Sequence, residues 1–202
     1  MSKNIRELLK EQTLPYHEKL ENTKISSKLA KAELTKDEYI MYLKNMKALH
    51  DTIEPFMCSF DEFEKYGLNP KKRTRIDLVK KDLDILNSSD EIPPLDIKNL
   101  KTPLEFESAI AWMYVLEGST MGGGFLAPRL SHFKGANDEV ATNYFLAYKE
   151  NTPVMWKEFI MFLEKINEDE NVDKKKITAA SINLFKHLIE VMDESCWFKY
   201  MC

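Results

Sequence analysis

The chain has 202 residues, of which 44% are hydrophobic and 31% are charged, a balance typical of a globular protein rather than a disordered one. Its formal net charge of −4 gives no electrostatic basis for nucleic-acid binding, and no run of apolar residues is long enough to predict a membrane-spanning helix. The first residues lack the apolar core of a signal peptide, so we expect a cytoplasmic protein folded as one domain over residues 1–202.

Apolar residues recur at spacings of three and four along most of the chain, while glycines and alternating β-branched residues are scarce. This period is typical of amphipathic helices. We therefore predict an all-α fold, a bundle of helices near residues 3–22, 35–65, 72–88, 103–133 with a break inside, 138–150, 153–167 and 173–195.

Several of these helices have recognisable start and stop signals. Thr35–Glu38 and Thr102–Glu105 both fit the capping-box pattern, and Pro103 would then occupy the favoured first helical position. A weaker start of the same kind occurs at Thr152, which precedes a proline. Pro55 is expected to kink or end the long second helix.

The cysteines and the basic clusters carry no recognisable chemistry. Cys58, Cys196 and Cys202 are odd in number and widely spaced, which disfavours a disulfide framework and a zinc site. Basic residues gather between Lys71 and Arg75, and such clusters usually form a solvated helix face.

Four of the six glycines lie within seven residues, at positions 118, 122, 123 and 124, inside an otherwise good helical pattern. Each glycine in a helix interior costs roughly 1 kcal/mol relative to alanine, so their presence requires a compensating role. One interpretation is tight helix–helix packing through Gly118 and Gly122. The other is a flat ligand lying directly against the helix backbone, and the spacing alone favours neither. A phosphate-binding loop is disfavoured because the lysine of that motif is absent.

The first predicted helix carries a possible metal ligand. Lys10, His17 and Glu21 are spaced by seven and four residues and so share one face. A metal-bound imidazole generally needs an acceptor for its second ring N–H, which Glu21 could supply, and Lys10 could meet the anionic edge of a ligand. A single histidine on an amphipathic helix is nonetheless more often structural.

Taken together, these segments resemble the haem oxygenase family. LKEQTLPYHEKLE (residues 9–21) is similar to the family's proximal helix, and YVLEGSTMGGG (114–124) resembles its distal helix, most closely that of bacterial biliverdin-forming members. Residues 143–166 and 179–192 resemble later helices of the same group. The resemblance covers most of the chain in the expected order, and the glycine-rich segment is its most specific part.

The resemblance implies a haem slot between the first helix and a kinked glycine-rich helix. Haem would be both substrate and cofactor, with its iron bound by His17 and with Glu21 as the partner of the imidazole. Lys10 would pair with a haem propionate. Gly118, Gly122 and Gly123 would pass their backbone over the distal haem face, next to Ser119. The reaction implied is oxidative cleavage to biliverdin, CO and free iron. Since the sequence has no flavin or nicotinamide motif, a ferredoxin, flavodoxin or reductase would supply electrons.

The sequence departs from the family pattern at three positions. Ser119 stands where many members have an aspartate, although the bacterial group shares the serine. Gly124 stands where a glutamine is usual, and Lys149 where bacterial relatives tend to have glycine.

Three alternatives remain open at this point. The first is a non-catalytic haem-binding module on the same fold. The second is a thiaminase-like hydrolase on a related helical fold, in which Cys58 or Cys196 would be the nucleophile. The third is a structural adaptor, which leaves the glycine cluster without a role.

Overall fold

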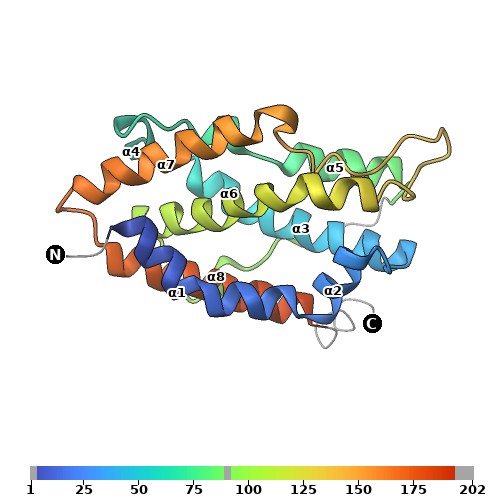
Figure 1. Ribbon diagram of the computed structural model, residues 1–202, viewed down its shortest axis with the longest axis horizontal. Coiled ribbons are helices and arrows are strands. Elements are labelled where there is room, and N and C mark those ends of the chain that lie inside the picture. The colour runs from blue at the N-terminus through green and yellow to red at the C-terminus, as the bar shows by residue number, and fades with distance from the viewer. Residues whose placement is uncertain (1–3, 89–91, 194–202) are drawn as a thin grey trace.

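The computed structural model describes residues 4–88 and 92–193, which fold into α-helices and short 3-10 helices (Figure 1). The α-helices are α1 (Ile5–Glu21), α2 (Lys24–Lys31), α3 (Lys36–Met57), α4 (Glu62–Lys65), α5 (Ile76–Ile85), α6 (Phe106–Arg129), α7 (Thr152–Glu168) and α8 (Lys174–Met192). The 3-10 helices are η1 (Pro70–Arg73), η2 (Ile97–Leu100) and η3 (Lys149–Asn151). These residues confirm the predicted all-α class, with one isolated β-bridge between Lys134 and Val140.

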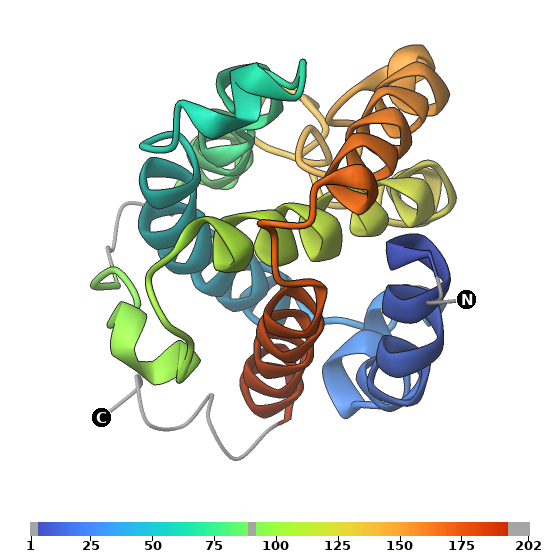
Figure 2. The same cartoon turned by 90° about the vertical axis from the view of Figure 1, so that its left-hand side faces the viewer.

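The helix α6 runs through the middle of the molecule in both views (Figures 1 and 2). It packs along α8 and also contacts α3 and α7, while α1 packs against α8 and α7. One hydrophobic core draws on all these helices, and its largest fully buried side chains include Trp112, Tyr39 and Phe63. None of the described helices combines the length and the apolar character needed to cross a membrane.

Several sequence signals are confirmed at the helix ends. The Thr35 side chain accepts a hydrogen bond from the backbone of Glu38, whose carboxylate accepts one in return, so the predicted capping box is present. Helix α3 contains Pro55 and ends two residues later, at Met57, so the predicted end of the helix near this proline is confirmed. Helix α7 begins at Thr152, one residue before the predicted start, and Thr152 is its first residue rather than its cap.

The predicted start and break of the glycine-bearing helix are wrong. Helix α6 begins at Phe106 rather than at residue 103, because the Thr102 hydroxyl donates to the Leu100 carbonyl instead of capping a helix. The helix then continues without interruption to Arg129. The glycines therefore lie in regular helix and do not break it.

The observed helices differ from the predicted ones at two further places. One difference comes from a contact that is remote in sequence, and the other from capping residues at the ends of a short helix. Residues 138–150 do not form the predicted helix, because the Asp82 carboxylate accepts hydrogen bonds from the backbone N–H groups of Asn143 and Tyr144. The short helix α2 was not predicted. Thr23 caps its start, and it ends at Lys31, before the C-cap residue Ala32, which has a left-handed φ of 59°.

Candidate functional site

A hollow of about 290 Å³ opens between α1 and α6. Both helices pack along α8 but share few contacts with one another, which leaves the space between them. Most of its wall is apolar and comes from four helices: Leu14, Leu20, Val115, Trp156, Phe185 and Leu188. The hollow can therefore hold a largely apolar molecule between the two helices.

The face of α1 toward this hollow carries the predicted residues Lys10 and His17, with Thr13 between them. His17 remains accessible, with 54% of its side chain exposed. Its Nδ1 lies 3.7 Å from Glu21 Oε1, within ion-pair range but longer than a hydrogen bond. The imidazole also packs edge-on against Phe185, with ring centroids 6.0 Å apart. These neighbours orient the ring without covering it.

The opposite wall of the hollow is the face of α6 that carries Tyr114 and Gly118. A Cβ added at Gly118 would meet no atom within 4 Å, so the missing side chain leaves open space at the wall. Gly122 lies one turn further along the same face, is exposed and has equally open space before it. Helix α6 thus presents bare backbone opposite α1.

Gly123 has a different neighbourhood from Gly118 and Gly122. It is buried, and a Cβ added there would lie 2.0 Å from the carbonyl oxygen of Phe145, a contact that no side chain can make. Close packing against the Phe145 backbone therefore accounts for this glycine. It borders a second, inner hollow rather than the one lined by His17.

Ser119 lines both hollows, and its hydroxyl is already hydrogen-bonded. Ser119 Oγ donates to the Leu116 carbonyl at 2.7 Å and accepts from Arg75 Nη1 at 3.3 Å. Arg75 Nη2 also donates to the Leu116 carbonyl at 2.9 Å. Its Nε is buried without a protein partner. Arg75 is thus a cation bound to α6 beside Gly118.

The interpretation of the basic cluster as a solvated face is wrong for its two arginines, each of which is only 3% exposed. Arg73 forms an ion pair with the buried Glu117 and a second one with Glu158. Tyr148 also donates its phenolic proton to Glu117. Arg73 and Arg75 therefore hold the part of α6 on either side of Gly118.

The inner hollow, of about 150 Å³, lies between α3 and α6 and has Arg75 and Tyr144 in its wall. Behind it, His50 Nε2 lies 3.2 Å from the Tyr144 hydroxyl and Nδ1 lies 2.6 Å from Glu54. Burial lowers the pKa of His50 and raises that of Tyr144, so both are neutral at physiological pH. A buried polar chain therefore borders this hollow on one side.

The outer end of the main hollow opens into a wider surface cleft of about 480 Å³. Lys10, Tyr114 and Trp156 line both, so they mark the junction. Lys10 is exposed there and can meet an anionic group that projects toward solvent. The position agrees with the predicted place of Lys10 at an open edge.

The family model described as "Heme oxygenase" matches residues 3–194, nearly the whole chain. The chain belongs to the haem oxygenase family. It is therefore an oxygenase that acts on haem, and the family resemblance of the glycine-rich segment is confirmed. No curated protein matches the sequence significantly.

Two solved haem oxygenases share the fold at low sequence identity. One is from Neisseria meningitidis, described in its NO- and CO-bound forms, with 19% identity, a TM-score of 0.70 and coverage of 95% of this chain and 91% of that one. The other is haem oxygenase-1 from Synechocystis sp. PCC6803 in complex with haem, with 15% identity, a TM-score of 0.77 and coverage of 98% and 96%. The fold is thus conserved where the sequence is not.

The residues around the main hollow fit a haem oxygenase. An accessible imidazole stands on one wall, side-chain-free backbone stands on the other, and a lysine lies at the open edge. Cys58, the nucleophile of the hydrolase alternative, is half-buried at the end of α3, and burial raises the pKa of its thiol. It is therefore a thiol rather than a thiolate at neutral pH. Cys196 lies outside the described residues.

Sequence reasoning missed Arg75, Tyr114 and Trp156 as parts of the site. No local pattern marks them, since each reaches the hollow only through tertiary packing. The departure at Lys149 falls where the backbone has a φ of 49°, in the left-handed region that favours glycine. The glycine of bacterial relatives suits this conformation better than lysine does.

Proposed function

We propose that the chain cleaves haem to biliverdin, CO and free iron, with haem held in the hollow between α1 and α6. His17 is the axial ligand of the iron, and Glu21 accepts a hydrogen bond from the second ring nitrogen once the 3.7 Å gap between them closes. The observation that carries the proposal is the placement of His17 opposite the bare backbone at Gly118.

Bound haem supplies the chemistry, because its iron reduces dioxygen and its own ring is the group that is oxidised. The protein positions the ring. Leu14, Leu20 and Phe185 pack against its apolar surface, and Lys10 pairs with a propionate at the open edge. Gly118 and Gly122 leave room for the distal face and offer no side chain that could bind the iron.

Polar groups on the distal side hold protons and water in place. The Ser119 hydroxyl donates its hydrogen bond to the Leu116 carbonyl, so Ser119 can act at most as an acceptor for one water molecule. Arg75 lines the inner hollow, and its guanidinium is held there by hydrogen bonds to Ser119 Oγ and to the Leu116 carbonyl. We assign to Arg75 the holding of water near the reacting ring, with the His50–Tyr144 chain behind it.

Electrons come from a separate ferredoxin, flavodoxin or reductase. The proposal is supported by the open edge of the hollow near Lys10, where an electron donor can approach the ring without entering the fold.

An absorption spectrum of the protein mixed with hemin, before and after addition of reductant in air, tests the proposal. We expect a haem band that disappears as biliverdin absorption and free ferrous iron develop. A band that survives reductant and oxygen unchanged would instead identify a haem-binding module without turnover. Absence of any hemin complex would exclude both.

A further inference from the structure

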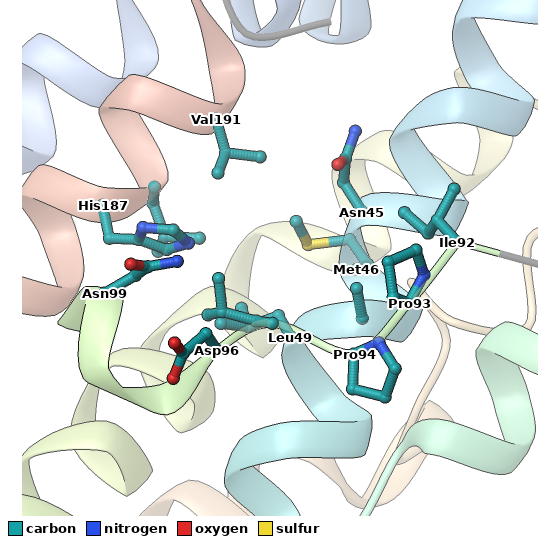
Figure 3. Close-up of a pocket in the computed structure, with 13 residues that line it drawn as sticks. Asn45, Met46, Leu49, Ile92, Pro93, Pro94, Asp96, Asn99, His187 and Val191 are labelled. Atoms are coloured by element: carbon teal, nitrogen blue, oxygen red, sulfur yellow. The ribbon is translucent and has the colours of Figure 1, made fainter. Parts of the chain in front are cut away.

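A third hollow, of about 80 Å³, lies between α3, α8 and the segment 92–99 (Figure 3). Its rim reaches solvent, because Pro93, Pro94, Asp96 and Asn99 are exposed. Its floor is apolar and buried. The hollow is therefore a pit that leads from the surface into the core, and none of its lining residues comes from α1, the helix that carries His17.

The floor of this pit is also a wall of the inner hollow. Met46, Leu49 and Leu188 line both spaces, and they are 4%, 4% and 8% exposed. A single layer of side chains therefore separates the inner hollow from a space that opens to solvent. We call these three residues the partition.

The partition is made of side chains that can move aside for a small molecule. Methionine is unbranched, with three rotatable bonds, and leucine side chains in cores change rotamer even though the time-averaged packing is tight. All three are apolar, so an ion or a water molecule passing between them would lose its hydrogen bonds. The partition thus favours small uncharged molecules.

The half-buried His187 on the rim is consistent with this selectivity. Burial lowers its pKa, so the imidazole is neutral at physiological pH.

Haem in the slot between α1 and α6 would close the side of the inner hollow that faces the main one, so gases would then need another route. A planar ring held against Gly118 covers the space through which the inner hollow meets the main one, since Ser119, Val115 and Leu188 line both. Dioxygen must reach the distal face and carbon monoxide must leave it while the ring is in place. A diatomic gas is about the size of a water molecule, and a water molecule needs a cavity volume of roughly 10–15 Å³. The pit and the inner hollow are both larger than this, so each can hold a gas molecule.

We propose that dioxygen and carbon monoxide pass between the inner hollow and the pit at the segment 92–99 when the partition side chains, Met46, Leu49 and Leu188, move aside. We call this route the passage. The inference rests on the proposed haem cleavage, because the gases are its co-substrate and product.

Ala48→Leu tests the passage without touching the haem slot. Ala48 is 8% exposed and lines the pit but neither of the other two hollows, so a leucine there fills the pit from its α3 side. Ala179→Leu on the exposed face of α8 is the matched control. The measurement is laser flash photolysis of the ferrous CO complex, which separates immediate recombination from escape to solvent and return.

We expect Ala48→Leu to raise the fraction of CO that recombines before escape and to slow bimolecular CO association several-fold, with Ala179→Leu unchanged from the wild type. If both variants bind hemin and match the wild type in both quantities, the passage does not exist and the gases use the mouth of the slot. If the wild type forms no hemin complex, the proposed function itself fails, so the two failures are distinguishable.

Crystals of the wild-type hemin complex under xenon pressure give an independent test should Ala48→Leu fail to fold. Xenon occupies dry apolar cavities in proteins. Xenon in the inner hollow and also at the pit side of the partition would support the passage. Xenon confined to the inner hollow would overturn it.

Discussion

Gly118 and Gly124 show how one residue type can have different roles within a single helix. Both have open space where a side chain would start, but Gly118 lines the hollow bordered by His17, whereas Gly124 is exposed and lines none of the three hollows discussed above. Gly123, by contrast, is required by its contact with the Phe145 backbone. The sequence showed the cluster, yet only the tertiary contacts separate packing from ligand space.

Leucine substitutions separate these roles. Gly118→Leu and Gly122→Leu should weaken hemin binding by about 1–3 kcal/mol, roughly 5- to 150-fold in Kd, because the ring and the new side chain need the same space. Gly124→Leu is the matched control and should bind hemin normally. All three should be as stable as the wild type or more so, by up to about 1 kcal/mol, since leucine is the better helix former. Equal hemin affinity in all three variants would show that the ring does not lie over Gly118.

At the scale of helices, most of the fold could be predicted from the sequence because the period of apolar residues and the cap at Thr35 are local signals. Much of what could not be predicted depends on remote partners. Asp82 overrides helix formation at Asn143 and Tyr144, and Glu117 binds Arg73 from another segment of the chain. The same limit applies to the site: His17 and the glycines stand in motifs, whereas Arg75 does not.

The ion pair between Arg73 and Glu117 should anchor α6. The Arg73→Met variant leaves the Glu117 carboxylate buried, at 1% side-chain exposure, without its cation. We expect a loss of about 3–5 kcal/mol in the free energy of unfolding, measured by urea denaturation. The double variant Arg73→Met/Glu117→Gln should recover much of that loss, because no buried charge remains. A single variant within about 0.5 kcal/mol of the wild type would contradict the anchoring role.

For the whole molecule, the buried His50 and the half-buried His187 should make stability depend on pH. Burial lowers the pKa of His50 and of His187 below the ordinary value of 6.5. In the unfolded chain both take up protons near pH 6.5, whereas in the folded protein they stay neutral to lower pH. The contribution of these two histidines to the free energy of unfolding is therefore fully present above pH 6.5 and is lost as the pH falls toward their folded-state pKa values.

Urea denaturation at a series of pH values measures this dependence. We expect the free energy of unfolding to fall below pH 6.5 by up to about 1.4 kcal/mol per pH unit for each histidine. The His50→Gln variant should show a smaller slope, because glutamine does not titrate. Asp82, whose pKa burial raises, contributes an opposite slope at lower pH. An unfolding free energy that stays constant or rises from about pH 7 to about pH 5.5 would contradict this account.

Hemin titration of the His17→Ala variant tests most directly whether His17 binds the iron of haem between α1 and α6. Because the 54%-exposed imidazole is not part of the core, the variant should keep the helical circular dichroism of the wild type. We predict that its hemin complex lacks the wild-type absorption band, that added imidazole restores the band, and that biliverdin formation falls to background without imidazole. A variant with the wild-type haem spectrum and full biliverdin formation would show that His17 is not the ligand.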